Sequence, residues 1–276
     1  MAKEKVGFIG LGIMGLPMAI NLQKAGYQVY AFDVVASVYE KSEKQGIISC
    51  KNPEEVARNS DNAIISIVRD YSQTEDVIFG QGGIISAGKK GQSIIIMSTL
   101  DPVSMKKLDE KVKLTGNNLV DAPVSGAQNG AEAGTLTVMA SGEKAESVCD
   151  RIFKAMGKNI FYFGLEVGAG QAAKLANNLV LAIAMVGYAE GLKFAEQYKL
   201  DSETFNKFIT CSTGNSWTAQ NWSLVRTWWE EYYPKNTLDI VYKDMFAIIK
   251  ECGESKHSLP LGGAAFQLLM DAWYRP

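Results

Sequence analysis

A glycine-rich turn near the N-terminus limits the fold of this chain more than any other feature. Residues 6–9 are an apolar run, and an amphipathic helical pattern with Pro17 in its first turn begins after residue 15. The turn between them consists of Gly10, Leu11, Gly12, Ile13, Met14 and Gly15. In such a turn the first glycine permits the tight bend, the second lets a pyrophosphate approach, and the third lets the helix pack on the strand. The pattern predicts a dinucleotide-binding βαβ unit.

A carboxylate follows the second predicted strand. That strand covers residues 28–32 and ends at Asp33, 18 positions beyond Gly15. A carboxylate at this place accepts hydrogen bonds from the adenosine ribose hydroxyls of NAD. It would repel the 2′-phosphate of NADP, and no basic residue stands in the next four positions, 34–37. The sequence therefore favours NAD over NADP.

Strand and helix patterns alternate as far as residue 164. Further strands are predicted at residues 62–68, 93–97, 118–120, 135–140 and 160–163. Such alternation predicts the α/β class, with a Rossmann-type, doubly wound, mostly parallel sheet in residues 1–164. Ligands of these sheets bind beyond the carboxyl ends of the strands. Val68 with Arg69, Ser98 with Thr99, and Ser125 with Gly126 all fall there.

A long helix is predicted over about residues 168–197, and only helical patterns follow it. Its middle, residues 179–189, is apolar on every side, which indicates a buried helix, and it is too short for a membrane span. Lys174 and Asn178 lie four positions apart on one face. Burying them would be costly unless a polar group occupies the space they face, although a locally satisfied lysine fits equally well. Residues 165–276 are predicted to form an all-helical substrate and oligomerisation domain joined through this helix.

Composition excludes several classes of partner. The formal charge of −2 gives no electrostatic reason to expect nucleic acid or an anionic membrane. Four scattered cysteines without a C-x-x-C spacing, and no signal-peptide pattern, predict a soluble cytoplasmic protein with reduced thiols. The single histidine, His257, lies in a polar stretch and is expected at the surface. No metal site is expected.

Several motifs in this order resemble the β-hydroxyacid dehydrogenase family of the 6-phosphogluconate dehydrogenase superfamily, which includes the 3-hydroxyisobutyrate dehydrogenases. They are the turn at 10–15, Ser98-Thr99 before Asp101-Pro102, the segment DAPVSG at 121–126 with GTL at 134–136, the segment at 170–178, and Lys243-Asp244. The resemblance covers nearly the whole chain.

The resemblance implies a role for each matching residue. Lys174 would be the catalytic acid and base, and Asn178 would help to hold the substrate. The substrate carboxylate would lie at Ser125, Gly126 and the position of Ala127, with Trp217 near the substrate. Cofactor contacts would come from Val68, Arg69, Thr99 and Lys243. The chain departs from the family at Ala127, where a second glycine is usual, at Arg69, where proline is common, and after the last helix, where relatives usually continue.

These features predict an NAD-dependent oxidoreductase for a small 3-hydroxy acid or a polyol-acid or sulfonate analogue. The hydroxyl proton needs an acceptor, and a lysine serves if burial and positive neighbours lower its pKa from about 10.4. Two alternatives stay open: an imine reductase, against which Lys174 argues, and a non-catalytic NAD-binding regulatory protein. The apolar helix and the aromatic residues at 222–233 predict a homodimer or homotetramer. The identity of the hydroxy acid and the direction of the reaction are left open.

Overall fold

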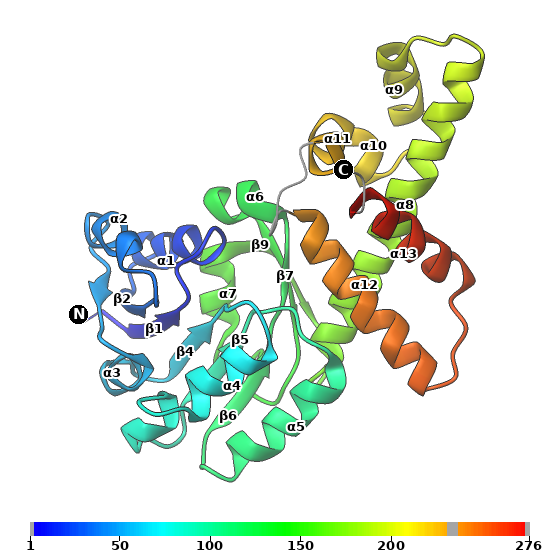
Figure 1. Cartoon of the computed structure of the whole chain (residues 1–276). Helices are drawn as coiled ribbons and strands as arrows, with labels where there is room; N and C mark the ends of the chain where they lie inside the picture. The colour runs from blue at the N-terminus through cyan, green and yellow to red at the C-terminus, as the bar shows by residue number, and fades with distance from the viewer. Residues whose placement is uncertain (1–2, 231–236, 274–276) are drawn as a thin grey trace. The chain divides into compact units, whose positions relative to one another are not determined.

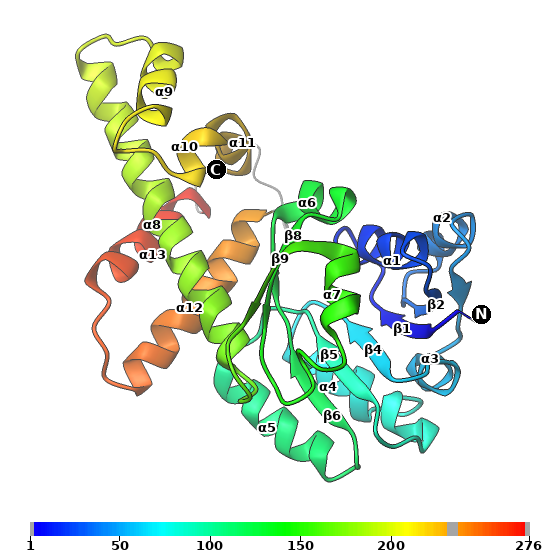
Figure 2. The ribbon, with the colours of Figure 1, turned by 180° about the vertical axis from the view of Figure 1, so that it is seen from behind.

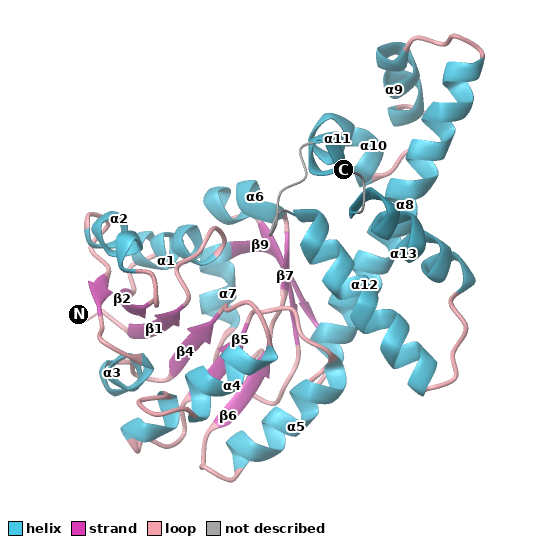
Figure 3. Ribbon diagram, viewed as in Figure 1, coloured by secondary structure: helices cyan, strands magenta, loops and turns pink. Residues whose placement is uncertain are grey.

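The computed structural model describes residues 3–230 and 237–273, and the chain forms two compact units (Figure 1). The first unit is Met1–Lys174 and the second is Leu175–Pro276. Every strand of the described residues lies in the first unit, whereas the second is helical (Figure 3). The predicted fold class is therefore confirmed. The contacts divide the chain after Lys174, ten residues beyond the predicted domain boundary at residue 164.

Six parallel strands form the main sheet of the first unit, in the order β3-β2-β1-β4-β5-β6. This is the doubly wound order of a dinucleotide-binding fold, with the reversal between β1 and β4. Ile9 pairs with both Phe32 and Ser66, so β1, β2 and β4 end at the same edge of the sheet. The strands are β1 (Lys5–Ile9), β2 (Gln28–Phe32), β3 (Ile48–Ser49), β4 (Ala63–Ser66), β5 (Ser93–Ile96) and β6 (Asn118–Asp121).

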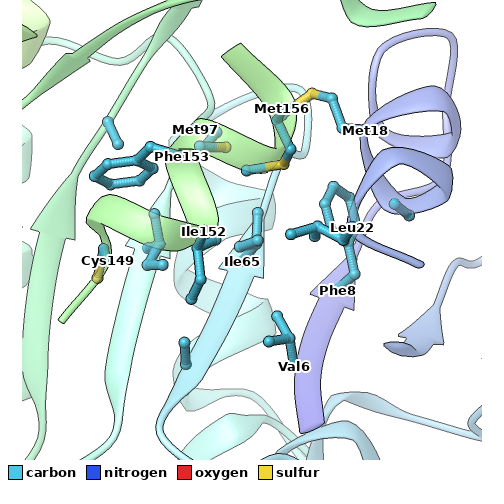
Figure 4. Close-up of a cluster of buried hydrophobic side chains, with 14 of the residues drawn as sticks. Val6, Phe8, Met18, Leu22, Ile65, Met97, Cys149, Ile152, Phe153 and Met156 are labelled. Carbon is cyan, nitrogen blue, oxygen red and sulfur yellow. The ribbon is translucent and has the colours of Figure 1, made fainter. Parts of the chain in front are cut away.

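Both faces of this sheet are covered by helices, which explains the continuous apolar runs of its central strands. Ile65 of β4 belongs to the core under α1 and α7, whereas Ile64 belongs to the core under α3, α4 and α5. Figure 4 shows Met18 and Phe153 in the first of these cores, and Figure 2 shows its two helices from behind. The helices are α1 (Gly15–Lys24), α3 (Pro53–Asn59), α4 (Tyr71–Phe79), α5 (Pro102–Lys113) and α7 (Asp150–Met156).

The last strands of the first unit correct the prediction. Residues 135–140 and 160–163 were expected to extend the parallel sheet, but they form a separate three-stranded sheet, β7-β8-β9. Its strands are β7 (Val124–Ser125), β8 (Leu136–Ala140) and β9 (Gly157–Tyr162), and β7 runs antiparallel to β8. Only two residues separate β6 from β7, whereas a parallel crossover needs about a dozen. The chain therefore leaves the main sheet after β6.

Four short elements complete the connections of the first unit. Helix α6 (Ala127–Ala133) joins β7 to β8, and η1 (Ala36–Val38) followed by α2 (Tyr39–Glu43) joins β2 to β3. The 3-10 helix η2 (Ile84–Ala87) precedes β5. Sequence periodicity did not predict these elements, since each has seven residues or fewer and lacks a repeated apolar stripe.

The second unit packs helices around a core of its own. That core includes Met185, Val225, Trp228, Met245 and Leu269. Its elements are α8 (Ala169–Gln197, with its first residues in the first unit), α9 (Ser202–Thr210), α10 (Trp217–Gln220), α11 (Trp222–Glu230), α12 (Thr237–Glu254) and α13 (Pro260–Trp273). The part of the aromatic segment at 231–233 lies outside the described residues.

Helix α8 differs from the prediction of a helix buried on every side. Ala182, Met185 and Tyr188 are buried, whereas Val180 is 67% exposed on the single chain. One apolar stripe packs into the core, and the other apolar positions are partly or fully exposed. By length and composition α8 could also cross a membrane, but the core helix of a soluble protein meets the same criteria.

Candidate functional site

The turn after β1 has the geometry expected of a phosphate-binding loop. Gly10 has φ 97°, and a Cβ on it would collide with the carbonyl oxygen of Ile67. A Cβ on Gly15 would collide with the carbonyl oxygen of Gly10, so α1 lies directly against the turn. A Cβ on Gly12 would meet no atom within 4 Å, so this glycine borders open space. The three glycines therefore differ as the sequence predicted.

The start of α1 suits an anionic ligand. No side chain of the described residues caps this helix, and its first turn carries no acidic residue. The free amides and the helix dipole at such a terminus attract phosphate. The residues present therefore fit the pyrophosphate of a dinucleotide.

Asp33 stands beside this loop, at the end of β2. One carboxylate oxygen accepts a hydrogen bond from the Leu11 amide at 2.6 Å, and the other accepts one from the Val35 amide at 2.7 Å. Val34 is 86% exposed, and the residues that follow Asp33 supply no cation. The carboxylate is thus fixed next to the glycine loop.

The loops after β4 and β5 are hydrogen-bonded to each other. The Val68 amide donates to Ser98 Oγ at 2.9 Å. Arg69 has an exposed side chain, and its amide donates to Gln73 Oε1 at 3.1 Å. Thr99 is half-buried between the buried Ser98 and Leu100. The predicted cofactor residues of these two loops therefore lie at adjacent strand ends of the first unit.

Two buried polar residues that sequence reasoning missed fix the start of α8. Asp121, at the end of β6, accepts hydrogen bonds from the amides of Gly168 and Gln171, both at 3.0 Å, and from Ser141 Oγ at 3.2 Å. Burial raises the pKa of Asp121 to about 6, although these hydrogen bonds oppose the shift. The side chain of Gln171, fully buried, donates to Asp121 Oδ1 and to the Ser98 carbonyl, both at 2.9 Å. A polar residue ending an apolar strand was the available signal for Asp121.

The turn after β7 has an unusual backbone. Ser125 is half-buried, and Gly126 has φ 131°. Ala127, where the resembling family usually has glycine, has φ 53°. A left-handed conformation costs an L-residue about 1–2 kcal/mol, which explains why glycine would be easier there. The turn thus holds a left-handed residue at this position although that residue is an alanine.

Lys174 is the last residue of the first unit and is 9% exposed. It lies on α8 four positions before Asn178, which belongs to the second unit. The predicted cofactor contacts other than Lys243 share the first unit with Lys174 and Ser125, whereas Asn178, Trp217 and Lys243 lie in the second.

In the second unit, Asn178 and Lys243 both interact with Asp244. Asn178 Nδ2 donates to Asp244 Oδ2 at 2.6 Å, and Lys243 Nζ lies 3.0 Å from Asp244 Oδ1. Asp244 is 1% exposed, and a buried carboxylate needs partners of this kind to offset its desolvation. The sequence motif contained Asp244 but gave it no role. Trp217 begins α10 and stacks on Trp228, with ring centroids 6.1 Å apart.

Other reactive side chains lie elsewhere. His257 is exposed, as predicted, and its Nδ1 lies 3.1 Å from Ser255 Oγ. Burial raises the pKa of Cys50 to about 11 and that of Cys149 to about 12, so neither is a nucleophile near neutral pH. Among residues 3–230 and 237–273, no cluster of three or more His, Cys, Asp or Glu could hold a metal ion.

Two families match consecutive parts of the chain. Residues 5–164 match the NAD binding domain of 6-phosphogluconate dehydrogenase. Residues 168–273 match the family described as NAD-binding of NADP-dependent 3-hydroxyisobutyrate dehydrogenase. The chain is also 37% identical over 267 residues to a 2-(hydroxymethyl)glutarate dehydrogenase of Eubacterium barkeri, covering 96% of this chain and 87% of that protein.

Solved structures share the fold. A 3-hydroxyisobutyrate dehydrogenase from Salmonella typhimurium superposes with a TM-score of 0.85 at 25% identity, covering 98% of this chain and 94% of that one. An imine reductase of Streptomyces aurantiacus has a TM-score of 0.69 at 18% identity, over 97% of this chain and 94% of the other. At that identity the second likeness concerns the fold alone.

Proposed function

Because this chain belongs to the β-hydroxyacid dehydrogenase family, we propose that it transfers a hydride between a small 3-hydroxy acid and NAD, with Lys174 as general acid and base. The broader activity is that of an oxidoreductase acting on the CH–OH group of hydroxy acids, with a bound NAD(P). The observation that supports hydride transfer with Lys174 as the acid and base is the burial of Lys174. Lys174 lies one helical turn after Gln171, which fixes α8 to the loops after β5 and β6.

Lys174 supplies the proton chemistry in this proposal. When bound, the nicotinamide accepts the hydride, but it cannot accept the hydroxyl proton of the substrate. A positioned amine takes that proton during oxidation and returns it during reduction. Backbone amides of the turn at Ser125 and Gly126 would bind the substrate carboxylate and so orient the reacting carbon. Asn178, oriented by Asp244, would hold the substrate from the same helix.

A small acid with its hydroxyl on the β-carbon is the proposed substrate class. The names of the relatives, 2-(hydroxymethyl)glutarate dehydrogenase and 3-hydroxyisobutyrate dehydrogenase, support it. Polyol-acid and sulfonate analogues belong to the same proposal, since each pairs an anionic group with a nearby alcohol. Trp217 would line the substrate side, and Val68, Arg69, Thr99 and Lys243 the cofactor side.

The two alternatives lack comparable support. An imine reductase needs no base for a hydroxyl proton, and Lys174 argues against that reaction. A non-catalytic NAD-binding protein could keep the glycine loop without Lys174, Asn178 and the turn at Ser125. The proposal also includes NAD rather than NADP as the preferred cofactor, a cytoplasmic location, and a homodimer or homotetramer.

Substitution of Lys174 tests the proposed chemistry. A panel of 3-hydroxy acids is first screened for NAD reduction. Lys174→Ala should then lower kcat by about 10²- to 10⁴-fold, the usual contribution of a positioned acid or base. NAD affinity should change little, because the glycine loop and Asp33 are unaltered. Lys174→Arg should not restore turnover, since a guanidinium does not release its proton near neutral pH.

Controls separate chemistry from folding. Lys193→Ala, at an exposed position of the same helix, should keep the wild-type kcat. The rate of alcohol oxidation should rise with pH in the wild type, and this rise should be absent in Lys174→Ala. A folded Lys174→Ala that keeps more than about a tenth of wild-type kcat, with chemistry rate-limiting, would show that Lys174 is not the base.

A further inference from the structure

We infer that Gln171 is a positioning residue that holds Lys174 in register with the cofactor-side loop at Thr99, an inference that rests on the proposed function. Gln171 itself is fully buried, and its side chain is hydrogen-bonded to other residues of the first unit. Its hydrogen bonds, rather than any contact with a ligand, carry the inference.

The carboxamide of Gln171 binds the backbone on both sides of Thr99. Nε2 donates to the Ser98 carbonyl at 2.9 Å, and Oε1 accepts from the Leu100 amide at 2.9 Å. The second Nε2 hydrogen goes to Asp121 Oδ1 at 2.9 Å. Because both donors and the acceptor are engaged, the side chain has one favourable orientation. The conformation of the loop at Thr99 is therefore linked directly to α8.

The same residue is fixed through its backbone at the start of α8. The Gln171 amide donates to Asp121 Oδ2 at 3.0 Å, and the Gly170 amide donates to Ser141 Oγ at 3.1 Å. These amides belong to the first turn, which lacks intrahelical partners. Lys174 follows Gln171 by three positions, about one turn later on nearly the same face. A shift of the first turn would therefore displace Lys174 as well.

The same network of hydrogen bonds extends to the loop after β4. Ser98, whose carbonyl binds Gln171, also accepts a hydrogen bond from the Val68 amide through Oγ. Three segments predicted to serve the reaction, at residues 68, 99 and 174, are thus connected by consecutive hydrogen bonds within one unit. Hydride transfer depends on sub-ångström alignment of such groups, and a misplacement of 1 Å costs about 10²-fold in rate.

Gln92 provides a matched control at the other end of the sheet. It is also a buried glutamine, and its Nε2 donates to the carbonyls of Ala57, Ser60 and Asp61 at 3.1, 3.3 and 3.2 Å. It precedes β5, so it lies at the amino edge, whereas Gln171 binds the carboxyl edge. Replacing either glutamine by methionine keeps the side-chain length and removes a comparable set of buried hydrogen bonds.

The test compares Gln171→Met with Gln92→Met in the full chain. We expect similar falls in Tm for the two variants, because each leaves backbone groups without partners. Gln171→Met alone should lower kcat per folded molecule by about 10- to 10²-fold, weaken NAD binding and shift the pH–kcat profile. Gln92→Met should stay within about twofold of wild type in kcat, with the wild-type pH profile.

Matching kcat, pH profile and NAD affinity in the two variants would overturn the inference and leave Gln171 a structural residue. If the wild type oxidises no hydroxy acid but binds NAD, the proposed function fails, and the inference is then decided by NAD affinity alone. Weaker NAD binding in Gln171→Met but not in Gln92→Met supports the inference. Equal NAD binding in the two variants overturns it. If Gln171→Met does not fold, Gln171→Asn and Gln92→Asn replace the pair, since both keep an amide on a shorter side chain.

Discussion

Asp33 fixes the end of β2 to the glycine loop, and its charge bears on the choice of cofactor. One oxygen binds the Leu11 amide and the other binds the Val35 amide. Two like charges about 4 Å apart near a protein surface repel by about 4 kcal/mol, so a 2′-phosphate beside this carboxylate is disfavoured. No cation follows in the sequence to offset that repulsion.

We therefore expect kcat/KM to be higher with NAD than with NADP. Asp33→Ala should reduce the ratio of the NAD value to the NADP value by about tenfold or more. Asp33→Asn removes the charge and keeps an acceptor for the Leu11 amide, which separates repulsion from loop packing. Asp61→Ala is the control, because Asp61 also binds a backbone amide, that of Lys5, but at the amino edge of the sheet. A wild-type enzyme that works better with NADP would contradict the prediction.

Residues whose roles follow from backbone geometry were predictable from the sequence. Gly10, Gly12 and Gly15 each have the surroundings that their spacing implied. Asp121, Gln171 and Asp244 were not predicted as functional, because their roles depend on hydrogen-bond partners 20 to 73 positions away in the chain. No local pattern indicates which distant carbonyl a glutamine binds.

Helix α8 depends at its N-terminus on a carboxyl group from β6. Burial raises the pKa of Asp121 to about 6 from its ordinary value of 3.8. The folded state therefore binds this proton more tightly than the unfolded state does. The stabilising contribution is fully present below about pH 4 and is lost as the pH rises through about 6. The pH dependence of stability has the opposite direction for Glu75 and Asp150, because hydrogen bonds from Lys111 and Lys154 lower the pKa values of these two carboxyl groups.

Asp121→Asn should remove this pH dependence, because the amide does not ionise. The variant loses hydrogen bonds at every pH, so it should be less stable than the wild type at pH 4. Between pH 4 and pH 7 its deficit in unfolding free energy should shrink by roughly 3 kcal/mol at most, from a shift of about two pKa units. Denaturant unfolding of both proteins at several pH values measures the difference. A deficit that stays constant over this range would contradict the shift.

At the scale of elements, the sequence predicted five of the six strands of the main sheet, but neither β3 nor the sheet to which the later strands belong. Residues 28–32 were predicted with the observed bounds of β2. An apolar run such as 135–140 has the same pattern in either sheet. The sequence did not predict β7, and it is the antiparallel pairing of β8 with β7 that places this run in the second sheet.

For the whole molecule, the exposed apolar residues of the second unit favour self-association. Several of them lie on α8, α9 and the link between these helices, namely Val180, Phe194, Tyr198, Leu200 and Phe208. Each is more than half exposed on the single chain, and α9 has no buried residue among its described positions. Exposed apolar surface of this kind usually marks an interface, and a second copy is the occupant we propose.

Light scattering at micromolar concentration should therefore report a dimer or tetramer. Phe208→Asp should shift the population towards monomer, because a carboxylate would be buried in the interface. Leu114→Asp is the matched control: Leu114 is 90% exposed but lies in the first unit, after α5, so assembly should not change. A monomeric wild type would refute the proposal.

The bonding of Gln171 also has a consequence for protein engineering. Its carboxamide binds the carbonyl of Ser98 and the amide of Leu100, and both groups belong to the main chain. These two hydrogen bonds therefore hold the loop by its main chain on both sides of position 99. A combinatorial library at this position would vary the chemistry presented at the strand end while these two hydrogen bonds remain available, which makes Thr99, a proposed cofactor contact, a suitable first site for retuning cofactor use.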